Sequence, residues 1–189
     1  RIFIRTRIYD VLATYVQETQ RHNGIRDLLD LLGPIINGFN VPIKDEHIKI
    51  LLHVLMPLHA APHLAVYYRN LSYCVQQYVI KEPTLAPAIL RLLIRFWPQT
   101  SAAKTIYFLD ELQVVLRYIP ITLFDADLAA LVMRCIGAGC ISSHFHVNER
   151  ALHMLECPET VHLLLQQHDT MYDVLVAALT ATARGHWCQ

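Results

Sequence analysis

Apolar residues recur along this chain at intervals of three and four positions, which is the spacing of one face of an α-helix. Four stripes carry this pattern most clearly. They are Ile25, Leu28, Leu32, Ile35 and Ile36; Ile48, Leu51, Leu52 and Leu55; Leu64, Tyr67, Leu71, Val75 and Tyr78; and Ile106, Leu109, Leu112, Leu116 and Ile119. No segment alternates clearly between apolar and polar residues as a half-buried strand would. The pattern predicts an all-α fold.

Residues that start or end helices bracket each of these segments. The breakers are Asn23-Gly24, Gly38, Pro62, Pro83, Pro98, Pro120, Gly137 to Gly139, and Pro158. We interpret Gly137 to Gly139 as a helix C-terminus, where glycine adopts a left-handed conformation without strain.

The predicted helix starts are regularly spaced. Leading helices begin near Asn23, His63, Ser101 and Ser143, and partner helices begin near Lys44, Thr84, Thr122 and His168. Both series advance by about 40 residues, a period typical of HEAT or armadillo repeats made of two helices each. The spacing therefore predicts one domain over residues 1–189, a right-handed α-α superhelix of about four to five helical hairpins. The segment 2–20 would be the trailing helix of a preceding repeat. An irregular helical bundle with coincidental spacing is the alternative.

The composition narrows the possible partners. It is 54% hydrophobic and 17% charged, which suits a helical protein that buries much of its length. Sixteen basic residues balance sixteen acidic ones, so no overall field favours nucleic acid or an anionic membrane. We expect neither a nucleic-acid nor a membrane partner.

One long apolar stretch could be mistaken for a membrane span. Residues 51–68 carry no charged side chain but include Pro57, Pro62 and three histidines. We predict a buried helix, a proline-bearing turn and the start of another helix here.

The cysteine pattern indicates the cellular compartment of the protein. Five cysteines, Cys74, Cys135, Cys140, Cys157 and Cys188, form no compact framework, which favours reduced thiols in the cytosol, with the nucleus as a second location. No signal peptide or lipidation motif is present.

The sequence opens with Arg1 inside a predicted helix, so we expect a piece of a longer protein. Apolar surface at severed repeat ends could then make the piece dimerise.

Eleven histidines raise the question of a metal site. His59 and His63 are four residues apart, but Pro62 is expected to interrupt the helix that would align them. His144 and His146 lack a nearby cysteine or carboxylate pattern, and no His-Glu-x-x-His motif is present. We therefore expect structural or surface roles for the histidines, and no metal or other cofactor.

The hypothesis that the protein is an enzyme depends on a single thiol and imidazole pair. Cys140 with His144 or His146 is the one nearby thiol and imidazole combination, and nothing marks an orienting group or an oxyanion hole. Surface recognition is the stronger hypothesis, since helical solenoids offer grooves for extended peptides. By periodicity alone Leu31 and Ile35 are core residues, and Lys44 and His47 lie on a solvated helix face.

Several runs resemble one known family, in its order and with matching gaps from about Arg1 to Leu155. The early runs are His22-Asn23-Gly24-Ile25, Ile35-Ile36-Asn37-Gly38-Phe39, Lys44-Asp45-Glu46-His47 and Val54-Leu55-Met56-Pro57-Leu58-His59. The later runs are Leu71-Ser72-Tyr73-Cys74-Val75, Phe96-Trp97-Pro98, Phe108-Leu109-Asp110-Glu111-Leu112 and the thirteen residues from Cys140 to Leu152. They resemble the B-prime (B56) regulatory subunits of protein phosphatase 2A. After Leu155 the likeness weakens, and His186-Trp187 restores the register.

The resemblance implies HEAT-like repeats in a non-catalytic regulatory protein. A member of this family connects the phosphatase scaffold and catalytic subunits and recruits substrates through a groove for short Leu-x-x-Ile-x-Glu segments. Carried over by position, the groove residues are Arg1, Asp30, Leu31, Ile35, Lys44 and His47. Leu31 and Ile35 would contact the apolar anchors, while Arg1, Lys44 and His47 would bind an acidic or phosphorylated flank.

The chain departs from the family at this groove. Asp30 and Leu31 stand where the family has Glu and Ile. The family's His-Arg-x-Tyr element, which contacts the motif glutamate, precedes the position of Arg1, so we expect this chain to hold one wall of the groove. The alternative function is a helical-repeat adaptor, for transport or the cytoskeleton, without a phosphatase partner.

Overall fold

The computed structural model of the chain describes residues 2–19, 24–165, 176–177 and 180. The chain divides into two compact units, Arg1–Phe96 and Trp97–Gln189. Both consist of α-helices joined by turns and short 3-10 or π-helical segments, and no strand occurs among the described residues. The prediction of an all-α fold is confirmed for this part of the chain.

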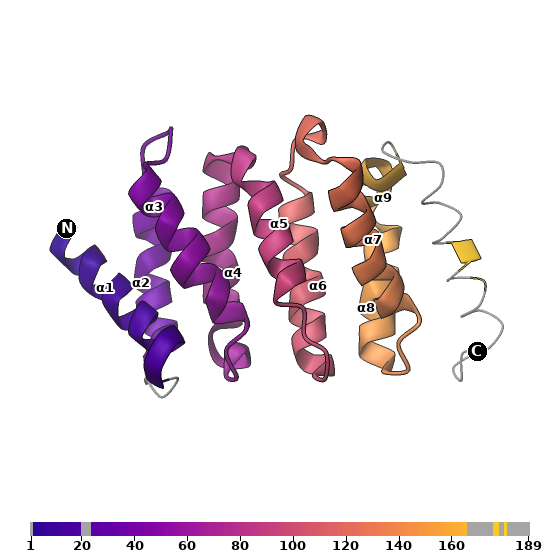
Figure 1. The fold of residues 1–189 in the computed structure, drawn as a ribbon, viewed down its shortest axis with the longest axis horizontal. Helices are drawn as coiled ribbons and strands as arrows, with labels where there is room; N and C mark the ends of the chain where they lie inside the picture. Colours follow the sequence, from indigo (N-terminus) through magenta and orange to yellow (C-terminus); the bar gives the residue numbers. More distant parts are fainter. Residues whose placement is uncertain (1, 20–23, 166–175, 178–179, 181–189) are drawn as a thin grey trace. The chain divides into compact units, whose positions relative to one another are not determined.

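The first unit has two layers of helices (Figure 1). Helices α2 (Ile25–Asn37) and α4 (Leu64–Lys81) lie side by side in one layer, and α3 (Asp45–Ile50) and α5 (Ala86–Arg95) form the other. Helix α1 (Ile2–Thr14) precedes them and continues as a π-helical turn, Tyr15–Thr19. Helix α3 continues through a π-helical turn, Leu51–Leu55, into a 3-10 turn, Met56–His59, and a second 3-10 turn, Pro83–Leu85, leads into α5.

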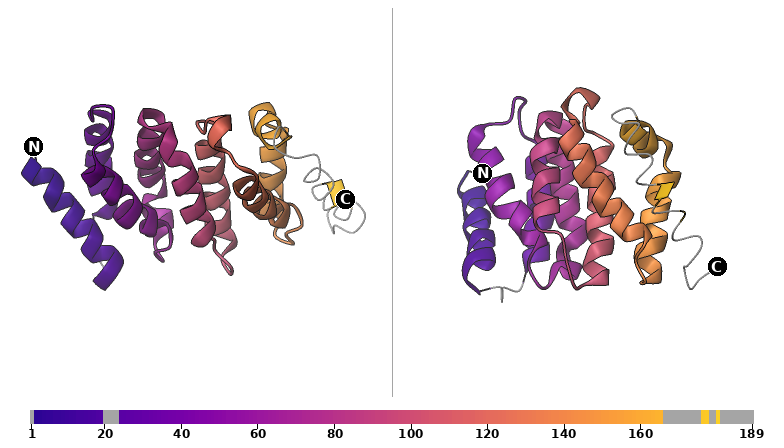
Figure 2. Two further views of the ribbon diagram at one scale, coloured as in Figure 1. Left: turned by 45° about the horizontal axis from the view of Figure 1, so that its top comes forward. Right: turned by 45° about the vertical axis from the view of Figure 1, so that its right-hand side comes forward.

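The second unit contains α6 (Ala102–Leu116), α7 (Ala126–Cys140), α8 (Phe145–Glu156) and α9 (Pro158–Leu165), with a 3-10 turn at Ile121–Leu123. Helix α8 packs against both α6 and α7 (Figures 1 and 2). Within the described residues of the two units, no helix is long and apolar enough to cross a bilayer.

Most of the predicted helix starts agree with the structure. Helices α3, α4 and α6 each begin directly after the residue at which a start was predicted, Lys44, His63 and Ser101. The Ser101 hydroxyl caps α6 by accepting a hydrogen bond from the Lys104 N–H at 3.4 Å. Helix α7 begins later than predicted, because residues 121–123 form a separate turn and the Asp125 carboxylate accepts from the Leu128 N–H at 2.7 Å.

The prediction that Pro158 bounds a helical segment is confirmed, because α8 ends at Glu156 and a new helix follows. Pro158 is the first residue of α9, where its missing N–H leaves no helical hydrogen bond unmade. The start predicted near His168 lies outside the described residues.

Residues forty positions apart lie side by side within each unit. In the first unit the Asn70 amide donates to the Asp30 carboxylate at 2.9 Å across forty positions. The Tyr73 ring lies over Gly33, again forty residues earlier. In the second unit the Arg150 guanidinium donates to the Asp110 carboxylate, also across forty positions. Neighbouring helices of one layer are therefore held in a fixed register.

Two tyrosines of α4 hold α3 and the irregular segment that follows it. The buried Tyr78 hydroxyl donates to the His47 carbonyl at 3.1 Å, and the buried Tyr67 hydroxyl donates to the Leu58 carbonyl at 2.9 Å. His59 is fully buried, and its Nδ1 lies 3.0 Å from the Met56 carbonyl oxygen. The predicted sequence of buried helix, turn and new helix over residues 51–68 is confirmed, including the break between His59 and His63.

Gly139 has a different role from the predicted one. Helix α7 runs through both Gly137 and Gly139, and neither adopts a left-handed conformation. Instead, a Cβ atom at Gly139 would lie 2.7 Å from the Cβ of Ala151 on α8. The glycine allows α7 and α8 to approach closely.

We predict opposite effects for two neighbouring Gly-to-Ala changes. Gly139→Ala should lower the free energy of unfolding by about 1–3 kcal/mol, because α8 must move away. Gly137→Ala should raise it by about 0.5–1 kcal/mol, since no atom lies within 4 Å of the added Cβ and alanine favours a helix. Urea denaturation of both variants measures this, and destabilisation by Gly137→Ala equal to that of Gly139→Ala would contradict the assignment.

We also predict a loss of stability in mild acid that depends on His59. Burial lowers the pKa of His59 from 6.5 to about 4, so the unfolded chain takes up a proton below about pH 6.5 that the folded chain does not. The free energy of unfolding should fall as the pH drops from 6.5 towards 4, by up to about 3 kcal/mol. Urea denaturation at pH 7.5 and pH 5 should give a smaller loss for His59→Gln than for the parent chain. Equal losses would exclude this role of His59.

Candidate functional site

The six residues predicted to form a peptide groove belong to the first unit, and the structure describes five of them. Asp30, Leu31 and Ile35 are on α2, Lys44 directly precedes α3, and His47 is on α3. Arg1 lies outside the described residues. The structure gives these five residues two kinds of surroundings, one on α2 and one around His47.

On α2 the predicted apolar anchors are accessible. Leu31 is 61% exposed and Ile35 is half-buried one turn later. The buried stripe of the helix, which includes Leu29, Leu32 and Ile36, faces elsewhere. The expectation from periodicity that Leu31 is a core residue is therefore wrong, and an exposed leucine is free to contact a ligand.

Asp30 connects α2 to α4. Its carboxylate is exposed and accepts the hydrogen bond from Asn70 at 2.9 Å. An aspartate side chain is shorter than glutamate, and here the contact with Asn70 fixes its direction along the α2–α4 seam.

His47 lies in a compact cluster of side chains from three segments. Its ring stacks on Phe39 with centroids 4.1 Å apart and planes 11° from parallel. Arg5 of α1 lies against the same pair, with its Cζ 5.9 Å from the Phe39 ring centroid and its Nη1 3.2 Å from His47 Nε2. The side chain of His47 is only 7% exposed. We call Arg5, Phe39, Glu46 and His47 the arginine cluster.

The charge state of His47 follows from its contacts. A guanidinium only donates hydrogen bonds, so the contact with Arg5 requires an unprotonated Nε2. Burial lowers the pKa of His47, and the nearby positive charge of Arg5 lowers it further, against a smaller opposite effect of Glu46. The 3.5 Å approach of Glu46 to His47 Nε2 is therefore no ion pair at neutral pH. The carboxylate is held by Arg5 instead, at 3.4 Å from Nη2.

Sequence reasoning missed Arg5 and Glu46 as members of this site. A signal was present, because Arg5 meets Glu46 and His47 across 41 and 42 positions, close to the predicted repeat length. Lys44 is exposed near the cluster and contributes to the field at His47.

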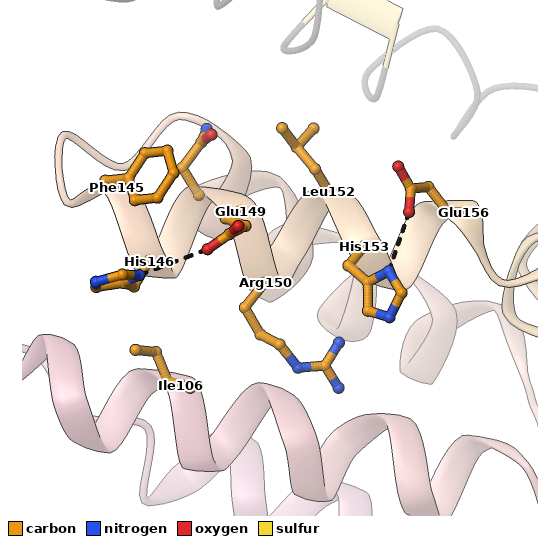
Figure 3. A pocket seen from close by; sticks show the side chains of 9 residues that line it. Ile106, Phe145, His146, Glu149, Arg150, Leu152, His153 and Glu156 are labelled. Carbon is orange, nitrogen blue, oxygen red and sulfur yellow. Dashed lines mark hydrogen bonds and ion pairs between the residues drawn. The ribbon is translucent and has the colours of Figure 1, made fainter. Parts of the chain in front are cut away.

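The second unit has a separate groove between α6 and α8, with a volume of about 750 Å³ (Figure 3). Ile106, Phe145 and Leu152 supply its apolar lining. Two pairs on exposed turns of α8, His146 with Glu149 and His153 with Glu156, lie at 3.5 Å and 3.0 Å. None of the predicted groove residues lines it.

The structure offers little for the catalytic or metal hypotheses. Cys140 is buried, and desolvation raises the pKa of its thiol to about 11, so it is not a nucleophile near neutral pH. Within the part of the chain that the structure describes, no three histidine, cysteine or acidic side chains are grouped so that they could hold a metal ion.

Comparison with known proteins identifies one family. The family model "Protein phosphatase 2A regulatory B subunit (B56 family)" matches residues 1–189. The chain is 38% identical to the B' gamma isoform of the 59 kDa phosphatase 2A regulatory subunits from Arabidopsis thaliana, over 100% of the chain and 36% of that protein. It is 36% identical to the alpha isoform of the 56 kDa regulatory subunits from Homo sapiens, over 99% of the chain and 38% of that protein. The chain thus spans less than two fifths of the length of these curated relatives.

Proposed function

Because the chain belongs to the B56 family of phosphatase 2A regulatory subunits, we propose that the full-length protein recruits substrates to this phosphatase. In this proposal it associates with the scaffold and catalytic subunits and binds Leu-x-x-Ile-x-Glu segments of its substrates. Regulatory subunits of this family are non-catalytic, as predicted from the sequence. The family match over the whole chain is the observation that carries the proposal.

We propose further that the helices stack as HEAT-like repeats in a right-handed superhelix, forming one domain over residues 1–189. The register within each unit supports this architecture, because Asp30 meets Asn70 and Asp110 meets Arg150 across forty positions. Contacts between equivalent positions are expected when one repeat stacks on the next. An irregular bundle gives no reason for one spacing to recur.

The surface of α2 supports peptide binding. Leu31 and Ile35 present neighbouring apolar side chains, one of them largely exposed. Lys44 is exposed, and the arginine cluster lies near it at the start of α3. Apolar anchors beside a positive group suit a segment with aliphatic residues and an acidic flank.

The phosphatase association can be tested by affinity purification. We expect the tagged full-length protein, expressed in cells, to retain both the scaffold and the catalytic subunit of phosphatase 2A. An unrelated HEAT-repeat protein with the same tag is the control. Recovery of neither subunit would instead favour an adaptor without a phosphatase partner.

Peptide recruitment can be tested by calorimetry. A peptide with a Leu-x-x-Ile-x-Glu core should bind the full-length protein, and Leu31→Ala should weaken it by about 1–2 kcal/mol, roughly five- to thirtyfold in Kd. Val66→Ala, at an exposed apolar residue of α4, is the matched control and should leave Kd unchanged. A peptide with alanine at the Leu and Ile positions should not bind. Absence of binding by the intact core peptide would refute the recruitment proposal.

A further inference from the structure

Helix α4 exposes apolar side chains on the side that faces away from the core. Val66, Tyr73 and Ile80 are 66%, 43% and 45% exposed, and they follow one another at intervals of seven residues. Because 3.6 residues make one turn, each of them is rotated by only about 20° from the one before it. We call these three residues the α4 ridge. Among the helices that the structure describes, no other carries three exposed large apolar residues.

The α4 ridge differs from the scattered apolar residues of an ordinary surface. Single exposed apolar side chains are common and need no explanation. Here they form a regular line, outside the apolar stripe that α4 already buries in the core. We propose that the α4 ridge docks an amphipathic α-helix of another protein, one with apolar residues at every seventh position and acidic residues beside them. This inference goes beyond the proposed recruitment of short peptides and does not depend on it.

The spacing of the ridge identifies the secondary structure of the partner. Seven residues of an α-helix rise about 10.5 Å, so the ridge is about 21 Å long. An extended peptide presents the side chains of one face about every 6.5–7 Å, and it therefore falls out of step with the ridge. A second helix with the same period of seven stays in step when the two axes cross at about 20°.

The charge of α4 identifies the residues that flank the apolar positions of the partner. The helix contains Arg69 and Lys81 and no acidic residue, and residues 47–81 include no aspartate or glutamate at all. Arg69 is exposed, and it lies in sequence between the first two residues of the ridge. Acidic side chains on the partner therefore meet complementary charge, and basic ones are repelled. A second copy of α4 is a poor partner, because it would bring only cations to Arg69.

Contacts with α2 hold the ridge in place (Figure 1). A Cβ atom at Gly33 would lie 2.6 Å from two carbons of the Tyr73 ring, so the two helices approach closely beneath the ridge. The Asn70 amide donates to the Asp30 carboxylate at 2.9 Å. A surface fixed in this way loses little conformational entropy when a partner binds. Leu31 lies about 100° around α2 from Asp30, so the predicted short-peptide groove is a separate surface.

The test uses two synthetic peptides, each three heptads long, with leucine at the first and fourth positions of every heptad. Positions five and seven are glutamate in one peptide and lysine in the other, and the remaining positions are alanine. Fluorescence anisotropy measures the Kd of each labelled peptide for the full-length protein. The glutamate peptide should bind roughly tenfold more tightly than the lysine peptide, because only its charges complement α4.

Two pairs of variants assign the binding to the α4 ridge. Ile80→Ala should weaken the glutamate peptide roughly fivefold, and Ile121→Ala, at a similarly exposed apolar residue of the second unit, should leave its Kd unchanged. Arg69→Glu should reverse the preference between the peptides. Arg134→Glu makes the same change at an exposed arginine of α7 and should preserve the preference.

Several results would overturn the inference. These are no binding of the glutamate peptide, equal binding of the lysine peptide, or an unchanged Kd in Ile80→Ala. A loss of preference in Arg134→Glu equal to that in Arg69→Glu would attribute the effect to total charge and exclude a docking surface on α4. Thermal melting of each variant identifies any loss of folding. Ile80→Ala removes only exposed atoms, so it keeps the test decisive if Arg69→Glu is unstable.

A competition experiment separates this inference from the recruitment proposal. An excess of the Leu-x-x-Ile-x-Glu peptide should change the Kd of the helical peptide by less than about twofold, because the two surfaces are separate. Val66→Ala, the control for the short peptide, should weaken the helical peptide roughly threefold. Displacement of the helical peptide by the short one would place both in one groove and overturn the inference. Binding of the helical peptide without binding of the short one would refute the recruitment proposal alone.

Discussion

The forty-residue register between neighbouring helices is the constraint on which the rest of this structure depends. It brings Asn70 to Asp30 and Arg150 to Asp110, so that polar side chains on facing helices satisfy one another instead of remaining unpaired. It also aligns Gly33 with Tyr73. A shift of one residue along α2 would rotate its buried stripe by about 100° and separate these partners. Packing and polar pairing therefore select the same register.

Helix α4 depends on this register and in turn holds the irregular segment before it. The π-helical and 3-10 turns over residues 51–59 interrupt the regular ladder of backbone hydrogen bonds. Tyr67 and Tyr78 reach two carbonyl groups of the neighbouring α3 and 3-10 segments from within α4. Their buried rings fill the core while their hydroxyl groups remain satisfied. The same contact from Tyr78 fixes the backbone of His47, which links the core to the candidate site.

Much of the fold could be predicted from the sequence, because helix starts and the spacing of apolar residues depend on residues that are close together in the chain. Lys44, His63 and Ser101 each precede a helix as expected. The misassigned features depend on tertiary contacts. Gly139 is required by the close approach of Ala151 on another helix. Leu31 belongs to an apolar periodicity and is nevertheless exposed, since periodicity shows which positions share a face but not whether another helix covers it.

The candidate site illustrates why residue identity alone does not determine a residue's role. By periodicity His47 belongs to a solvated helix face, and the family resemblance assigns it to an acidic or phosphorylated flank, which a protonated ring would bind best. The fold instead buries that ring against Phe39 and sets a permanent cation, Arg5, at its accepting nitrogen. Protonation would then place two positive charges within 3.2 Å of each other in a poorly solvated cluster, which disfavours the protonated ring. The positive charge of the cluster thus lies on Arg5, a residue supplied from 42 positions away and made adjacent only by the stacking of the helices.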